Sequence, residues 1–109
     1  MAPQPKRIVR YSPAADLDIT ENHNFTAHHW GADQADRYTK FLIKAAQLAA
    51  NTKAGKPIKG IKAVKYVFAK WPKAKNGHNI IFTEEAHGIY ILRILHSAMD
   101  VQKHIKGEE

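Results

Sequence analysis

Among the residues of this sequence that could do chemistry are its seven histidines and its lysines and arginines, whereas none of its 109 residues is a cysteine. The absence of cysteine excludes disulfides, thiolate metal sites and cysteine nucleophiles. Histidine titrates near neutrality, so an imidazole can move a proton while a neighbouring cation stabilises the charge of a phosphate. His96 ends one predicted strand and His78 precedes another. We interpret His78 as a turn residue rather than a catalyst.

Three further histidines, His23, His28 and His29, lie within one predicted helix. Their spacing of i, i+5 and i+6 does not bring three imidazoles to one face of a helix, so we expect no zinc or other metal site. Nothing in the sequence indicates a nucleotide or an organic cofactor, and we expect none.

The net charge of +7 is concentrated in the middle of the chain, where residues 37–83 contain eleven cations and no acid. Such a stretch creates a positive field that attracts nucleic acid or an acidic protein, unless it is only a solvated lysine-rich face. Lysine outnumbers arginine there, which argues against bidentate reading of base edges. The charge therefore predicts an anionic partner without naming it.

The elements that must position these residues begin with a strand at residues 6–11. Ser12 and Pro13 form a strong helix-start signal, and that helix is predicted to run to Trp30 and to end at Gly31. A second, clearer helix ends near Asn51. Its apolar stripe consists of Ala35, Tyr38, Leu42, Ala45 and Ala49, widened by Phe41 and Leu48.

A lysine-rich connection at residues 53–62 leads to three predicted strands at 63–71, 79–83 and 89–96, and then to a helical turn at 100–106. Short turns make the three strands an antiparallel meander. The order β-α-α-β-β-β(-α) predicts one α+β domain over residues 1–109, with a helical hairpin packed on one sheet face and with residues 1–5 flexible. No apolar run approaches the roughly 18 residues of a membrane span, and we expect a cytoplasmic protein.

Arg93 lies in the most apolar strand. Alternation places Ile89, Ile91, Arg93 and Leu95 on one face, and Tyr90, Leu92, Ile94 and His96 on the other. A guanidinium among such neighbours requires a partner, so we predict an ion pair with an acid from the first helix or the last turn. Trp71 and Lys70 form an aromatic–cation tip for which we favour a contact role, with core packing of Trp71 as the alternative.

Several short motifs share an order and spacing with one family. They are Tyr11–Ile19 at the first strand–helix junction, His29-Trp30-Gly31 with 35–38 at the hairpin turn, Gly77–Phe82, and Gly88–His96 followed by Met99-Asp100. Together they resemble the RelE/ParE superfamily of bacterial toxin–antitoxin toxins, and its ParE branch in particular. The resemblance covers about residues 7 to 105 and implies the same β-α-α-β-β-β(-α) fold.

The resemblance implies one of two activities on this fold. RelE-like members are ribosome-dependent endonucleases that cut mRNA, whereas ParE-like members poison DNA gyrase without catalysing a reaction. Both kinds are neutralised by a cognate antitoxin whose C-terminal segment wraps the toxin. We therefore expect an acidic, partly disordered antitoxin that orders along the hairpin and sheet in a hetero-oligomer.

The set of residues with which RelE-like members cut RNA is incomplete in this chain. Lys65 is kept, but Val67 and Asn79 stand where those members carry a lysine and an arginine, and neither can stabilise a phosphate charge as a cation does. We therefore predict a non-catalytic inhibitor of DNA gyrase. The alternatives are an mRNA endonuclease that uses Lys65, Arg93 and His96, and a binding module that has lost its toxicity.

The ParE branch carries a histidine at the position of His96, which favours a structural or partner-binding role. The candidates for target binding are Lys65, Lys70, Trp71, Arg93, His96, Met99, Asp100 and Lys103. The chain also departs from its branch: Thr83-Glu84 replaces a common aromatic and basic ending, and Asn22 and His23 stand where relatives are more apolar. We expect these departures to affect the target or the choice of antitoxin rather than the fold.

Overall fold

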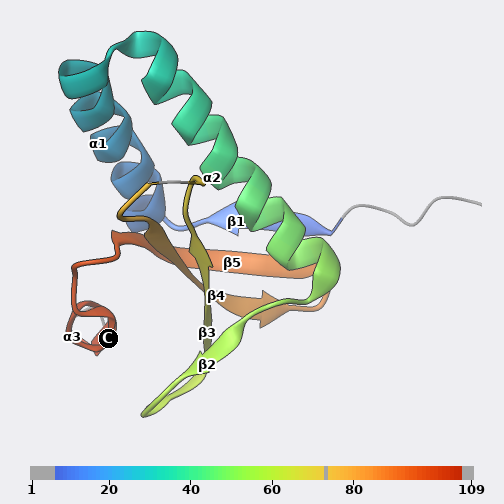
Figure 1. The fold of residues 1–109 in the computed structure, drawn as a ribbon. Coiled ribbons are helices and arrows are strands. Elements are labelled where there is room, and N and C mark those ends of the chain that lie inside the picture. The colour runs from blue at the N-terminus through green and yellow to red at the C-terminus, as the bar shows by residue number, and fades with distance from the viewer. Residues whose placement is uncertain (1–6, 73, 107–109) are drawn as a thin grey trace, which may run out of the picture.

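The computed structural model describes residues 7–72 and 74–106, and the predicted flexibility of residues 1–5 lies outside these ranges (Figure 1). The elements are β1 (Ile8–Tyr11), α1 (Pro13–Trp30), α2 (Ala32–Thr52), β2 (Lys56–Ile58), β3 (Ile61–Ala69), β4 (His78–Glu85), β5 (Gly88–His96) and α3 (Val101–Lys106). The predicted α+β order is confirmed. The connection at 53–62 differs from the prediction, because it contains the short strand β2, which forms a hairpin with β3.

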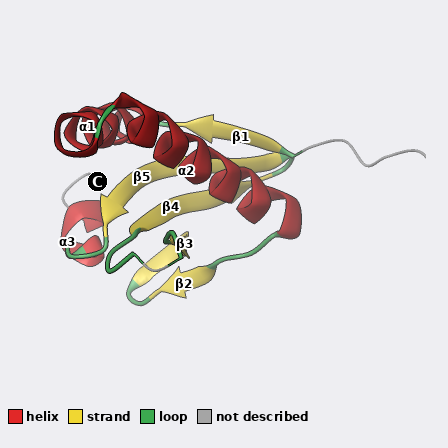
Figure 2. Cartoon of the chain, turned by 45° about the horizontal axis from the view of Figure 1, so that its top comes forward, coloured by secondary structure: helices red, strands yellow, loops and turns green. Residues whose placement is uncertain are grey.

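One five-stranded sheet has the order β1-β5-β4-β3-β2. β1 pairs in parallel with β5, and the other neighbours are antiparallel. The hairpin of α1 and α2 covers one face, whereas α3 lies at the other (Figure 2). Each face therefore has its own apolar cluster: Leu42 and Phe82 belong to the one under the hairpin, and Leu95 and Ile105 to the one under α3.

α1 begins and ends where the sequence predicts, but most of its large apolar side chains are exposed rather than packed in the core. The Ser12 hydroxyl accepts a hydrogen bond from the Ala15 N–H at 2.9 Å, and Gly31 ends the helix with a φ of 96°. Leu17, Phe25 and Trp30, however, are all more than half exposed. Ala15 is the buried hydrophobic residue of this helix, and Ile19 is partly buried against the cluster under the hairpin.

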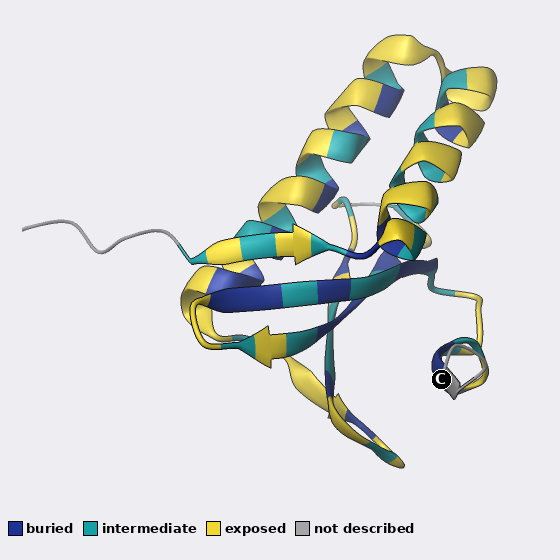
Figure 3. Cartoon of the chain, turned by 180° about the vertical axis from the view of Figure 1, so that it is seen from behind, coloured by how far each residue is buried: buried dark blue, intermediate teal, exposed yellow. Residues whose placement is uncertain are grey.

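α2 packs through the predicted stripe. Ala35, Tyr38, Leu42 and Ala49 are buried, while Leu48 at its margin is 62% exposed. The short alanine side chains let the helix lie close to the sheet. Figure 3 shows the result: the outer surfaces of both helices are exposed, and the long strand β5 is largely buried.

The predicted alternation in β5 is wrong beyond Ile91. Ile81 pairs with Arg93 while Phe82 pairs with Ile91, so Leu92 is an extra residue that bulges from the ladder. The bulge changes which residues share a face. Ile94 joins Ile91 in the cluster under the hairpin, whereas Leu95 lies in the cluster under α3.

Candidate partner-binding site

Arg93 is held by the first helix. Its Nε and Nη2 donate to the two carboxylate oxygens of Asp18 at 2.8 and 2.9 Å, and Asp18 also accepts from the backbone N–H of Ile94 at 2.9 Å. This arrangement arises because β1 ends at Tyr11, so the start of α1 covers the next stretch of the β5 edge. The predicted ion pair with an acid of the first helix is therefore confirmed.

His78 is a buried strand residue, so its interpretation as a turn residue is wrong. Its Nδ1 hydrogen-bonds the hydroxyl of Tyr38 at 2.7 Å, and its ring meets the ring of His96 edge to face at 5.6 Å. Burial, and to a smaller extent the neighbouring His96, lower the pKa of His78 to about 4, while Asp18 opposes the shift. Burial also raises the pKa of Tyr38 to about 12. Both side chains are therefore neutral at pH 7.

A cleft of about 200 Å³ opens beside these rings, between the tip of the helical hairpin and the segment that joins β3 to β4. Its lining combines rings and amides: Asn22, Phe25, Thr26, Trp30, Gln34, Tyr38, Trp71, Asn76, His78 and His96. We call it the hairpin cleft. Trp71 is one of these lining residues, and it packs edge to face on Tyr38 with ring centres 4.8 Å apart. Trp71 thus serves both the core and a surface, which were the two predicted alternatives.

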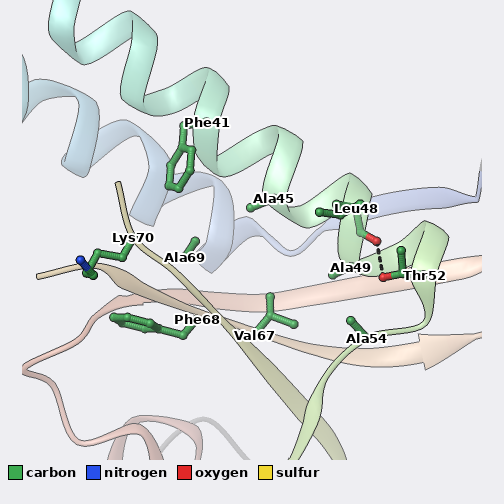
Figure 4. A pocket seen from close by; sticks show the side chains of 10 residues that line it. All are labelled: Phe41, Ala45, Leu48, Ala49, Thr52, Ala54, Val67, Phe68, Ala69 and Lys70. Atoms are coloured by element: carbon green, nitrogen blue, oxygen red, sulfur yellow. Dashed lines mark hydrogen bonds between the residues drawn. The ribbon is translucent and has the colours of Figure 1, made fainter. Parts of the chain in front are cut away.

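A second hollow of about 340 Å³ lies between α2 and β3 (Figure 4). We call it the α2–β3 groove, and its lining is mostly aliphatic: Phe41, Ala45, Leu48, Ala49, Thr52, Ala54, Val67, Phe68, Ala69 and Lys70. Leu48 and Phe68 are 62% and 51% exposed. Lys70 donates to the carbonyl of Ala74 at 2.8 Å.

The sheet edge beside this groove is open. Among the described residues, β2 is the strand that pairs with β3 on this side, and the pairing ends at Lys56 opposite Tyr66. The backbone from Val67 to Ala69 therefore borders the groove beyond the end of β2. An apolar groove next to a free strand edge can receive an extended segment of another chain.

The predicted target-binding residues do not form one site. Trp71 and His96 line the hairpin cleft, and Lys70 lines the α2–β3 groove. The Nζ atom of Lys65 lies 3.9 Å from a carboxylate oxygen of Glu84. The remaining candidates of the C-terminal segment, Met99, Asp100 and Lys103, are exposed at or beside α3, where the Asp100 carboxylate accepts from the Lys103 N–H.

The sequence does not predict the α2–β3 groove. One signal could have indicated it, because Pro57 has no N–H to donate and so marks a short edge strand that leaves part of β3 unpaired. The exposed Leu48 and Phe68 carry no such signal, since their apolar character fits a core equally well. Within residues 7–72 and 74–106, no group of three or more histidine or acidic side chains could hold a metal ion. No helix in these ranges is long and apolar enough to cross a membrane.

Comparison with known proteins agrees with this architecture. Residues 9–101 match the family described as ParE toxin of type II toxin-antitoxin system, parDE. Toxin ParE1 of Mycobacterium tuberculosis is 31% identical over 97 residues, which cover 86% of this chain and 93% of the relative. Toxin ParE1 of Caulobacter vibrioides is 23% identical over 97 residues, covering 88% and 95%.

Among solved structures, a chain of the "Chromosomal ParDE TA system from P. aeruginosa" superposes with a TM-score of 0.66 at 20% identity, covering 83% of this chain and 95% of that one. At this identity the likeness supports the fold alone. The family match spans most of the sequence and agrees with the motifs at Tyr11–Ile19 and Gly88–His96. This chain belongs to the ParE toxin family of type II toxin–antitoxin systems.

Proposed function

We propose that this toxin inhibits DNA gyrase without catalysing a reaction, and that a cognate antitoxin neutralises it by occupying the α2–β3 groove. The observation that supports a non-catalytic mode is the separation of the groups that would cut RNA. Lys65 is level with Phe82 of β4, whereas His96 is level with His78, four positions away. At the rise of a strand, this is about 13 Å, too far for both to act on one phosphate.

Arg93, the third residue of the candidate RNA-cleaving set, is bonded to Asp18. Both carboxylate oxygens of Asp18 accept from Arg93, so the guanidinium is committed to the fold rather than to a developing phosphate charge. Removal of one charge-stabilising donor costs an enzyme a factor of about 10² or more in rate. The arrangement thus favours the gyrase inhibitor over the mRNA endonuclease.

The antitoxin site rests on the α2–β3 groove and its open strand edge. An extended segment can hydrogen-bond the free edge of β3 and insert apolar side chains beside Leu48 and Phe68. The groove belongs to the stretch of residues 37–83 that carries eleven cations and no acid, and Lys70 lines it directly. An antitoxin segment with apolar anchors and acidic flanks is complementary to both properties.

The gyrase proposal is tested with purified toxin, gyrase and plasmid DNA. We expect supercoiling to decrease and cleaved, linear DNA to accumulate. If supercoiling continues and no linear DNA appears, gyrase is not the target. In that case a translating extract tests the alternative, in which codon-positioned cuts in mRNA would disappear in the variant His96→Ala.

The antitoxin proposal is tested with the variant Phe68→Glu, which places a carboxylate in the groove at a half-exposed position. We expect the affinity for the antitoxin to fall more than tenfold. Leu17→Glu is the matched control, because Leu17 is similarly exposed on α1 and does not line the groove. Equal affinity of the two variants would show that the antitoxin binds elsewhere.

A further inference from the structure

The hairpin cleft offers a different chemistry from the α2–β3 groove. Its described lining contains six rings and three amide side chains and no carboxylate. Trp30 and Phe25 stand at the hairpin tip with 66% and 60% of their surface exposed, a high degree of exposure for such large apolar rings. Such a lining suits a flat ligand whose edges carry hydrogen-bond donors and acceptors.

One group in the cleft lacks a partner. The amide nitrogen Nδ2 of Asn22 is buried and has no hydrogen bond within the described residues. A buried donor without a partner destabilises the protein unless something else supplies an acceptor. A ligand in the cleft whose edge carries an acceptor can supply this partner.

Exposed lysines lie next to the cleft and favour a ligand that carries negative charge. Lys70 and Lys75 are exposed next to Trp71 and Asn76, two residues that line the cleft. Nucleobases stack on aromatic side chains in proteins that bind single strands, and asparagine or glutamine can hydrogen-bond their edges. We propose that the hairpin cleft binds one unpaired base of a single-stranded nucleic acid, with Trp30 as the stacking surface and Asn22 as the edge contact.

The state of the neighbouring histidine is compatible with this ligand. His78 remains neutral at pH 7, so its ring adds a polar edge to the cleft without adding a buried charge. A base in a paired duplex is already stacked and cannot enter, which restricts the site to unpaired nucleotides. The proposal goes beyond gyrase inhibition and does not require it.

The chain contains its own reporter, because both of its tryptophans, Trp30 and Trp71, line the cleft. Tryptophan fluorescence is titrated with a short single-stranded DNA, with the RNA of the same sequence, with the duplex, and with a DNA of equal length that lacks its bases. We expect quenching by DNA or RNA single strands. Binding of the abasic strand should be at least tenfold weaker, although its phosphates are the same. Equal affinities for the base-bearing and abasic strands would mean purely electrostatic binding and would overturn the proposal.

Two variants test the named contacts. Asn22→Leu and Trp30→Ala should each weaken single-strand binding about tenfold, measured by the anisotropy of a labelled strand. Leu17→Ala is the control, since it removes an exposed apolar side chain from the same helix outside the cleft. Thermal unfolding checks that each variant folds. Native affinity in both cleft variants would overturn the proposal.

The gyrase assay runs in parallel with these titrations. A toxin that inhibits gyrase but binds base-bearing and abasic strands equally loses the base site and keeps its proposed function. A toxin that discriminates between the strands but leaves gyrase active keeps the base site and loses the proposed function.

Discussion

The two ends of the sheet differ in whether their cations form salt bridges. At the end where α1 meets β1 and β5, which we call the α1–β5 junction, cations face acids: Arg7 and Glu84 at 2.9 Å, Arg10 and Glu85 at 2.9 Å, and Arg93 and Asp18 at 2.8 Å. At the other end, the β2–β3 arm (residues 53–65) extends away from the hairpin (Figure 1). Within the described residues, Lys53, Lys56 and Lys62 of the arm form no salt bridge and are exposed. The comparison separates cations that pair with acids of the fold from cations that are exposed on the arm, and we expect the exposed ones to meet an anionic partner.

The backbone also differs between the junction and the arm, in how closely other atoms approach it. A side chain at Gly88 in the junction would collide with the Ile8 carbonyl of the neighbouring strand. In the arm, Gly60 has a φ of 83° with open space around it, and Ala63 adopts a φ of 64° despite its Cβ atom. The junction is therefore fixed by close contact, whereas the arm is shaped by local turns. Substitutions should separate the two ends sharply.

The largest effect is expected from Asp18→Ala at the junction. The substitution removes the carboxylate that accepts from the guanidinium of Arg93 and from the N–H of Ile94, in a site where the side chains of Asp18 and Arg93 are only 10% and 18% exposed. Breaking such a pair should lower the free energy of unfolding by about 3 kcal/mol in a urea titration. Asp36→Ala is the control, because Asp36 is 62% exposed in its pair with His23, and it should cost about 0.5 kcal/mol or less. Similar losses in the two variants would contradict this assignment.

Alanine substitutions at Gly88 and at Gly60 test how tightly the backbone is packed in the junction and in the arm. Gly88→Ala should destabilise the protein by about 3 kcal/mol, because the new methyl group forces β1 away from β5. Gly60→Ala should cost only about 1 kcal/mol, the price of a left-handed φ at a residue with open space around it. Urea unfolding of both variants measures the difference. Comparable values would indicate that the junction is as adaptable as the arm.

The elements that the sequence predicted well are those with a local signal. Ser12-Pro13 and Gly31 delimit α1 because capping depends on neighbours in the chain, and the stripe on α2 follows from helical periodicity. The sequence also predicts that Arg93 has an ion-pair partner, because a guanidinium in an apolar strand requires one. That the partner is Asp18 depends on how α1 runs along β5, which no local pattern encodes.

The bulge at Leu92 and the hairpin cleft could not be predicted for a related reason. A single extra residue in β5 changes the face of every residue after it, and nothing in its apolar sequence distinguishes Leu92 from its neighbours. The cleft unites α1, α2 and the segment around Asn76, which are distant in the sequence. His78 was misread for the same reason, because its partner Tyr38 lies forty residues away.

The buried His78 should make stability depend on pH. Its pKa is about 4 in the folded protein and 6.5 as an ordinary histidine, so between these values the unfolded chain binds the proton more readily. The stability present above pH 6.5 is therefore lost as the pH falls towards 4. Because the ring keeps some contact with solvent, we expect a loss of about 2 kcal/mol rather than the full linkage value.

His78→Asn removes this titration and retains a polar group beside Tyr38. The difference in unfolding free energy between the native protein and the variant, measured from pH 7 to pH 4, should shrink by the same amount. His96 and Asp18 face His78 and are present in both proteins, so their contributions to the difference largely cancel. If that difference does not change with pH, protonation of His78 does not cause the loss of stability.

The smallest effect on stability, and the sharpest test of the charge comparison, comes from two variants that lose one positive charge each. Arg7→Gln removes a cation that donates to Glu84 and to the carbonyl of Gly88, and should cost about 1 kcal/mol. Lys62→Gln should change the free energy of unfolding by less than about 0.5 kcal/mol. The order should reverse on a heparin column, where Lys62→Gln elutes at lower salt than Arg7→Gln, because the acid beside Arg7 already screens its charge from a polyanion. Since both variants have the same net charge, identical elution would show that the anionic surface responds to total charge and that the division between the two ends has no bearing on binding.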